Sequence, residues 1–251
     1  MSNELKIAIE AAKAGAEKGL EYFNQDIPVS VKEDNTVVTK ADSEAEEKIK
    51  GIILSKFPDA KFVGEEGGGD KTLEEFWIID PIDGSRNFVR GIPNWCVLIA
   101  LFRKGTIELG VVYYPHDNNI YYAQRGMGAY LNDKKIHVSK IPTLAKSYFA
   151  FGSPRHFKDK QVLIDLIDHT ASSRAWDATY CACLIASGKI DAYVDGYGKL
   201  WDLAPFKVLV EEAGGRITRP NGSEWTTDGS SAVMSNGLVH DEMITIIDGR
   251  V

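Results

Sequence analysis

The chain has 251 residues, of which 44% are hydrophobic and 26% charged, with a net charge of −7 and a pI near 5.3. This is the composition of a globular protein with room for a full hydrophobic core, as one large domain or two packed halves. No basic stripe or arginine-rich run is present, so nucleic acid is not an expected partner, and no segment has the length of a membrane span.

The N-terminal stretch MSNELKIAIEAAKAGAEKGL has no basic region followed by an apolar block, so we expect no secretory signal. The three cysteines, Cys96, Cys181 and Cys183, cannot all pair, and their spacing matches no zinc pattern. Reduced thiols in the core of a cytoplasmic protein are the expectation that follows.

The first elements are predicted to be helices. Apolar residues between Leu5 and Phe23 recur with a helical period. The stretch VTKADSEAEEKIKGIILSKF indicates a short strand and a second helix, with Ser43 and Glu46 as a capping box. After Pro58, KFVGEEGGGD indicates a strand that runs into an acidic, glycine-rich loop.

Strands dominate from 76 to 138, where apolar stretches alternate with turn residues as in an antiparallel sheet. From about 147 strands and helices alternate, with helices at 157–170 and 177–187 and another stopped by Gly214 and Gly215. We predict an α/β fold of the layered α+β kind. It forms a single domain over 1–251, with an N-terminal α+β half at 1–145 and a C-terminal α/β half at 146–251.

Several acidic residues stand at the ends of these elements rather than on helix faces, namely Asp42, Glu65, Glu66, Asp80, Asp83 and Asp202. Singly, each could cap a helix, shape a turn or lie in a solvated loop. Together they would repel one another unless a cation binds between them, and Mg²⁺ prefers such oxygen ligands. In WIIDPIDGSRNF the Ile82 carbonyl adds a ligand, and Gly84 and Ser85 could hold a phosphate.

These stretches resemble the inositol monophosphatase family of metal-dependent, lithium-sensitive phosphomonoesterases. The resemblance rests on TKAD at 39–42, GEE at 64–66, WIIDPIDGSRNF at 77–88, LWDLAP at 200–205 and EEAGG at 211–215. It implies the sandwich of alternating helix and sheet layers shared by inositol monophosphatases and fructose-1,6-bisphosphatases. It also implies a homodimer, for which the apolar VVYY at 111–114 offers a surface.

The resemblance implies two to three Mg²⁺ ions per site. Glu65, Asp80 and the Ile82 carbonyl would hold one, while Asp80, Asp83 and Asp202 would hold a second. A third, weaker ion would bind by Glu65 and water. The attacking water would be activated near Glu65 and Ser85, with Asp42 accepting a hydrogen bond from Ser85.

The same resemblance implies residues that bind the substrate. Gly84 and Ser85 would bind the phosphate, Asp195 and Asp177 would face the leaving group, and Glu66 and Lys32 would line the site less directly. Trp176, next to Asp177, is expected to reshape the leaving-group pocket by its bulk.

The expected partner is a small phosphorylated metabolite, and its identity stays open. NFVRGIPNWCVLIALFRKG and SNGLVHDE resemble histidinol-phosphatase members of the family. Histidinol phosphate and inositol monophosphate are therefore equally favoured as substrates. Another sugar-phosphate or nucleotide phosphatase of the fructose-1,6-bisphosphatase kind is an alternative, as is a non-catalytic protein that binds a phosphorylated ligand. A P-loop is excluded because no G-x-x-x-x-G-K-[ST] occurs.

Overall fold

The computed structural model describes residues 1–26, 28–31 and 37–251, which form two compact units, Met1–Tyr122 and Ala123–Val251. Lys32, expected to line the site, lies outside the described residues. The single domain with halves at 1–145 and 146–251 stays a prediction. Among the described residues, no helix combines the length and apolarity that a membrane crossing requires.

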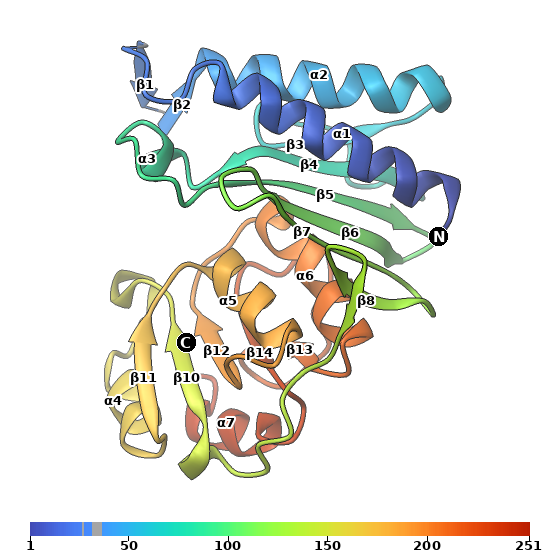
Figure 1. The fold of residues 1–251 in the computed structure, drawn as a ribbon. Helices are drawn as coiled ribbons and strands as arrows, with labels where there is room; N and C mark the ends of the chain where they lie inside the picture. Colours follow the sequence, from blue (N-terminus) through green and yellow to red (C-terminus); the bar gives the residue numbers. More distant parts are fainter. Residues whose placement is uncertain (27, 32–36) are drawn as a thin grey trace. The chain divides into compact units, whose positions relative to one another are not determined.

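The first unit is a layer of helices on a sheet (Figure 1). Helices α1 (Asn3–Leu20) and α2 (Lys40–Lys56) contact each other, and they contact the sheet through β4, β5 and β6. The strands are β3 (Phe62–Gly64), β4 (Glu75–Asp83), β5 (Cys96–Arg103), β6 (Thr106–Tyr114) and β7 (Asn119–Gln124), in that order. A ribbon of β1 (Val29–Val31) and β2 (Val37–Thr39) and the short helix α3 (Ser85–Phe88) complete the unit.

Small residues let α1 and α2 approach closely. The buried side of α1 is rich in alanine and glycine, and a Cβ on Gly15 would lie 2.6 Å from Cγ1 of Ile49 on α2. Apolar side chains of α2 and of the central strands fill the layer below, with Ile49, Ile79 and Ile99 fully buried. This layer fixes the position of α2 against β4. Asp42 lies on α2, and Asp80 and Asp83 lie on β4.

The N-terminus of α2 differs from the prediction. Thr39 is the N-cap, and its backbone N–H donates to Asp42 Oδ2 at 2.7 Å, so the capping box is Thr39–Asp42 rather than Ser43–Glu46. The helix begins one turn earlier than predicted because Thr39 is itself a good cap in extended conformation. Glu46 lies inside the helix, buried, and is available for another contact.

The second unit has a five-stranded sheet in the order β11-β10-β12-β14-β13. These strands are β10 (Tyr148–Phe151), β11 (Ser172–Ala175), β12 (Ala192–Asp195), β13 (Arg216–Thr218) and β14 (Ala232–Ser235), and a hairpin of β8 (Gly128–Leu131) and β9 (Lys134–Ile136) precedes them. Its helices are α4 (Gln161–Asp168), α5 (Ala178–Ala186), α6 (Leu200–Glu212) and α7 (His240–Ile247), with 3₁₀ turns η1 (Leu144–Lys146) and η2 (Pro154–His156).

Helices cover both faces of this sheet. Side chains of α4 and α7 form one buried cluster with Phe149, Val194 and Val233. The neighbouring residues point the opposite way, because side chains alternate along a strand, and helices α5 and α6 contact β12, β13 and β14. The predicted α/β fold with helix and sheet layers is therefore confirmed. The helix predicted at 157–170 is shorter, since α4 begins only at Gln161, whose N–H donates to Asp159 Oδ1 at 2.9 Å, and ends at Asp168.

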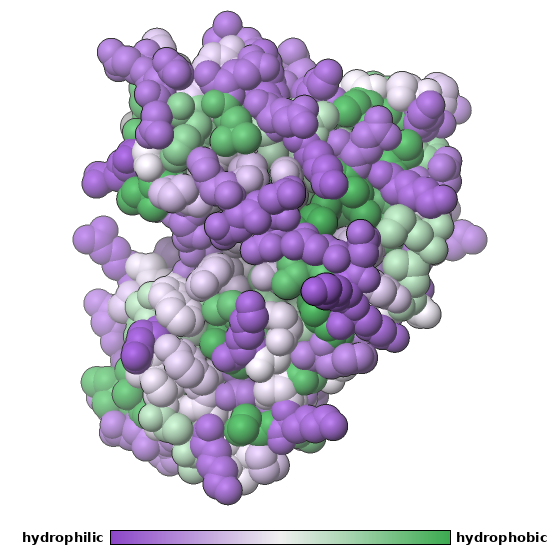
Figure 2. Space-filling view, viewed as in Figure 1, coloured by the Kyte–Doolittle hydropathy of each residue, from purple (hydrophilic) through white to green (hydrophobic). Residues whose placement is uncertain are grey.

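The face shown in Figure 2 is mostly hydrophilic, with hydrophobic residues in separate small groups. The VVYY stretch, offered above as a surface for a partner subunit, lies on β6, where Val111 and Val112 are buried. Helix α1 contacts this strand within the same unit. These two valines therefore belong to the core of the chain and not to an available surface.

Candidate active site

A bulge at the end of β4 brings two carboxylates together. Asp80 pairs with Leu98 and Asp83 with Cys96, so three steps along β4 oppose two along β5. On a regular strand residues three apart point to opposite faces, and the extra residue returns Asp83 to the side of Asp80. Pro81 fits here because a bulge does not need its missing N–H. An oxygen of Asp80 and one of Asp83 lie within 4.8 Å of each other.

Neighbouring groups hold these carboxylates in place. Asp80 is 2% exposed, and its Oδ1 accepts the Ile82 N–H at 3.1 Å. Asp83 is half-buried, and the Cys96 thiol lies 3.7 Å from its Oδ2, within reach of a weak S–H donor. Burial of two anions at this spacing is costly unless a cation binds there.

The chain turns sharply after Asp83. Gly84 has φ 88°, in the left-handed region, and α3 starts at Ser85. A Cβ at Gly84 would lie 3.0 Å from the Asn94 carbonyl oxygen, so glycine is required for both reasons. In this structure the Ser85 hydroxyl donates at 3.0 Å to the Ile82 carbonyl, which is itself a predicted metal ligand, and not to Asp42 as expected.

Glu65 follows β3, beside Asp80. Strand β3 runs parallel to β4 with Gly64 opposite Ile79, and the Glu65 N–H donates to the Ile79 carbonyl at 3.2 Å. Glu65 and Glu66 are half-buried in a tight turn closed by two hydrogen bonds between Gly64 and Gly68. The turn therefore holds Glu65 next to Ile79, the residue that precedes Asp80 on β4.

Asp42 lies on α2 and is 2% exposed. Its Oδ2 accepts hydrogen bonds from both the backbone N–H and the hydroxyl of Thr39, each at 2.7 Å. Burial raises the pKa of Asp42, the Thr39 hydrogen bonds oppose that rise, and the negative charge of Glu65 adds to it. The place of Asp42 in the acidic set stays a prediction.

The remaining predicted residues belong to the second unit. Asp202 is in the first turn of α6, where its Oδ2 accepts the Lys199 N–H at 2.8 Å. Asp177 is the N-cap of α5 and accepts the Tyr180 N–H at 2.9 Å, which is the structural role open to any such aspartate.

Asp195, also in the second unit, is 6% exposed at the end of β12. Its Oδ1 lies 2.8 Å from Nδ1 of His156 and accepts the Tyr197 N–H at 3.2 Å, while the Tyr193 hydroxyl donates to Oδ2 at 3.0 Å. Burial raises the pKa of Asp195, and the contacts with His156 and Tyr193 oppose the rise. It is a buried carboxylate with several partners rather than a loop residue.

The donor set at the end of β4 fits a hard divalent cation. Asp80, Asp83 and the Ile82 carbonyl offer only oxygen atoms, with Glu65 on the adjacent strand, and such cations take oxygen ligands. A softer metal is not favoured, because these ligands are all oxygen atoms and the thiol of Cys96 is directed to Asp83 as a donor.

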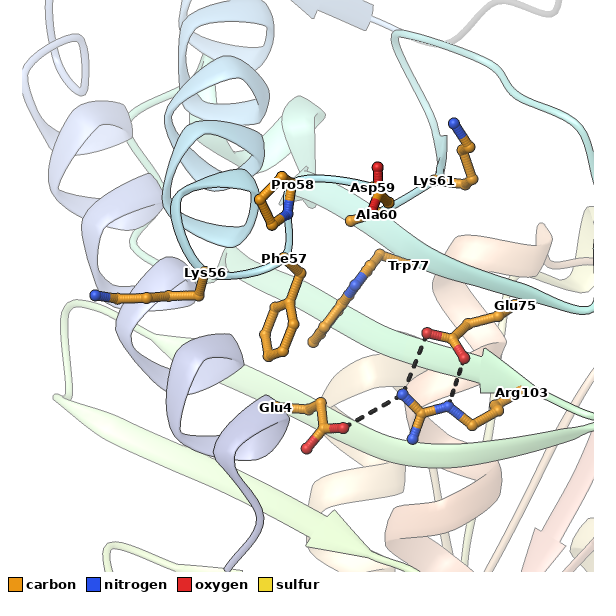
Figure 3. Close-up of a pocket in the computed structure, with 10 residues that line it drawn as sticks. All are labelled: Glu4, Lys56, Phe57, Pro58, Asp59, Ala60, Lys61, Glu75, Trp77 and Arg103. Atoms are coloured by element: carbon orange, nitrogen blue, oxygen red, sulfur yellow. Dashed lines mark hydrogen bonds and ion pairs between the residues drawn. The ribbon is translucent and has the colours of Figure 1, made fainter.

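A separate cavity of about 420 Å³ lies at the opposite end of β4 (Figure 3). Phe57 and Trp77 form part of its wall, and Arg103 bonds to Glu75 at 2.6 Å and to Glu4 at 3.3 Å. The predicted site residues placed above are not among the residues that line this cavity. These ion pairs join Glu4, Glu75 and Arg103, while Lys56, Asp59 and Lys61 also line the cavity, which lies apart from the site at Asp80.

Three residues that contact the predicted site residues were not predicted from the sequence. Glu46 contacts the turn that carries Glu65, Cys96 contacts Asp83, and His156 contacts Asp195. The spacing of Asp42 and Glu46, four apart on one helix, was a usable signal, since such residues share a face. The other two contacts depend on strand register and on a 39-residue separation, which no local pattern reveals.

Known proteins resemble the chain over its whole length. The sequence model of the inositol monophosphatase family matches residues 1–249. A histidinol-phosphatase of Chlorobaculum parvum is 35% identical over 98% of this chain and 97% of its own. A fructose-1,6-bisphosphatase/inositol-1-monophosphatase of Thermotoga maritima is 35% identical, covering 84% and 82%, and a Nus factor SuhB of Pasteurella multocida is 37% identical, covering 88% and 87%.

Solved structures agree with this assignment. The Thermotoga maritima IMPase superposes with a TM-score of 0.91 at 31% identity, covering 99% of this chain and 98% of that one. The extragenic suppressor protein SuhB of Bartonella henselae also gives a TM-score of 0.91, at 26% identity and full coverage of both chains.

Proposed function

The chain belongs to the inositol monophosphatase family, whose members are metal-dependent phosphatases, and we propose that it is a Mg²⁺-dependent phosphomonoesterase acting on a small phosphate monoester. The observation that carries the proposal is the bulge of β4, which aims two buried or half-buried carboxylates at one point. Holding two carboxylates this close together is costly, and a bound cation would offset that cost.

In this proposal Glu65, Asp80 and the Ile82 carbonyl would hold one Mg²⁺ ion. Asp80, Asp83 and Asp202 would hold a second, and a third would bind near Glu65. Bound cations would supply Lewis-acid polarisation of the phosphate and a water of lowered pKa. Ile82 supports this role in two ways, since its N–H fixes Asp80 and its carbonyl is fixed by Ser85. Inhibition by Li⁺ follows from the family assignment and belongs to the same proposal.

Residues of the chain would bind the ester and move the proton. The backbone N–H groups of Gly84 and Ser85, at the start of α3, would donate to phosphate oxygens. Glu65 would accept the proton of the attacking water, and the Ser85 hydroxyl would orient that water. As the P–O bond to the alcohol breaks, the departing oxygen would take a proton from solvent water. For Asp42 to accept a hydrogen bond from Ser85, the hydroxyl has to leave the Ile82 carbonyl, so this contact requires a rotation of the Ser85 side chain.

Histidinol phosphate is the first candidate substrate, and the full-length similarity to a histidinol-phosphatase supports it. Inositol monophosphate is the second, supported by the Thermotoga maritima relative. Asp195, with Asp177 beside Trp176, would face the leaving group, and Glu66 and Lys32 would line the site. We propose further that the protein is cytoplasmic and homodimeric, and that 1–251 acts as one domain.

Turnover on a substrate panel tests the proposal. With Mg²⁺ present, we expect phosphate release from histidinol phosphate or inositol 1-phosphate to exceed release from fructose 1,6-bisphosphate and adenosine bisphosphate by at least tenfold. Preference for either bisphosphate would instead favour the fructose-1,6-bisphosphatase-like or nucleotide alternative. Binding of the esters without release would favour a non-catalytic protein, an outcome that relatives named Nus factor make worth testing.

A further inference from the structure

Glu46 is a buried carboxylate for which the proposed reaction has no use. Its side chain is 4% exposed, in the middle of α2. Oε2 accepts the Glu66 N–H at 3.1 Å and Oε1 accepts the Gly67 N–H at 3.0 Å. Lys50, one turn further along the helix, reaches Oε1 at 2.5 Å and supplies the compensating charge. Both oxygens of Glu46 are thus directed to one turn, the turn that carries Glu65.

The turn is shaped around this carboxylate. A Cβ on Gly64 would lie 2.7 Å from Oε2 of Glu46, and a Cβ on Gly67 would lie 2.7 Å from Oε1. Glycine at both positions therefore lets the backbone close on Glu46, and neither residue adopts a left-handed conformation that would by itself explain glycine. Two N–H donors in succession fix the orientation of the peptides on the C-terminal side of Glu65.

A second anchor acts on the other side of the same residue. The Glu65 N–H donates to the Ile79 carbonyl, next to Asp80. Glu65 is therefore held between β4, through its own N–H, and α2, through the N–H groups of the two following residues. Helix α2 also carries Asp42, one turn before Glu46 and on the same face.

We propose that Glu46 is a positioning residue that orients Glu65 for binding the divalent cation, with Lys50 neutralising its charge. The inference rests on the proposed function, because it needs Glu65 to be a ligand. Residues that orient metal ligands typically change metal affinity or activity by about 10- to 100-fold when they are replaced.

The test compares Glu46→Gln with Glu47→Gln, its exposed neighbour on the same helix. A glutamine at 46 offers one acceptor oxygen, and its NH₂ group faces the second N–H donor. We expect the Kd for Mg²⁺, measured by titration calorimetry, to rise about tenfold or more in Glu46→Gln and to stay unchanged in Glu47→Gln. Amide hydrogen exchange at 64–68 in the metal-free protein is expected to speed up only in the first variant.

Two further variants separate positioning from general damage to the fold. Gly64→Ala keeps the charge of Glu46 but displaces its carboxylate, so it should raise the Kd similarly if Glu46→Gln fails to fold. If Glu46 acts through Glu65, adding Glu46→Gln to Glu65→Gln should weaken Mg²⁺ binding no further.

Equal Mg²⁺ affinity in Glu46→Gln and the parent would overturn the inference and leave the proposed function intact. A double variant that binds Mg²⁺ ten times more weakly than Glu65→Gln would also overturn the inference and leave the proposed function intact. Absence of Mg²⁺ binding by the parent would overturn the proposed function and the inference with it.

Discussion

Asp195 is bonded to neighbouring residues of the fold, and we also propose a role for it in substrate choice. His156, Tyr193 and the Tyr197 N–H occupy its oxygens, and a carboxylate oxygen can accept more than one hydrogen bond. If it also faces a cationic leaving group, Asp195→Asn should lower kcat/KM for histidinol phosphate by about 10- to 100-fold. The loss on inositol 1-phosphate should be smaller, and that on p-nitrophenyl phosphate slight. An equal loss on all three would show that Asp195 serves only the fold.

His240 is predicted to make stability depend on pH. It is fully buried, with Thr218 Oγ1 and Ser235 Oγ each 2.9 Å from a ring nitrogen, and burial lowers its pKa from 6.5 to about 4. The unfolded chain therefore binds this proton first, so the stabilisation present above pH 6.5 is lost as the pH falls toward 4. By pH 5 the loss is about 2 kcal/mol.

Chemical denaturation at pH 7 and pH 5 measures this effect, with His240→Asn as the control because asparagine keeps a hydrogen-bonding side chain that does not titrate. The parent should lose about 2 kcal/mol more than the variant between the two pH values. Equal losses in both proteins would mean that His240 is not the group responsible.

The junction of β4 and α3 is predicted to depend on Gly84. An alanine there must adopt φ 88° and place its Cβ against Asn94 and Trp95. A left-handed alanine costs about 1–2 kcal/mol, so Gly84→Ala should lower the free energy of unfolding by at least that much. Gly51→Ala is the matched control, because this exposed helical glycine has open space around it and the change should stabilise α2 by about 0.5–1 kcal/mol. A stable Gly84→Ala protein would contradict the account of this turn.

Sequence reasoning succeeded where the signal was local and failed where it was not. The apolar run FWIID and the acids after it predicted a buried strand ending in Asp80 and Asp83, which β4 confirms. The bulge that turns both acids to one side is set by pairing with β5, and no feature of residues 77–88 alone fixes that register. Glu46 was wrongly assigned to a capping box because Ser43 also resembles a helix cap. Its actual contact, with the 64–68 turn, depends on the packing of that turn against α2, which the local sequence does not reveal.

The assembly of the whole molecule stays a prediction. Because Val111 and Val112 are already buried, a homodimer has to use other surfaces, and exposed apolar side chains such as Ile92, Ile164 and Leu238 are available. We expect light scattering at micromolar concentration to give twice the chain mass of 27.7 kDa. A value equal to one chain, unchanged on tenfold concentration, would remove the dimer from the account.

Metal-dependent hydrolysis is the activity proposed for the whole molecule. Phosphate release from histidinol phosphate and inositol 1-phosphate should be measured for the parent and for Asp80→Asn, each in Mg²⁺, in chelator, and after Mg²⁺ is restored. Asp80→Asn removes the charge of the carboxylate proposed to bridge two ions while keeping its shape, so we expect at least a thousandfold loss, about 4 kcal/mol. The parent should be active in Mg²⁺, inactive in chelator and active again on restoration. Undiminished release in chelator, or an Asp80→Asn variant as active as the parent, would contradict the account.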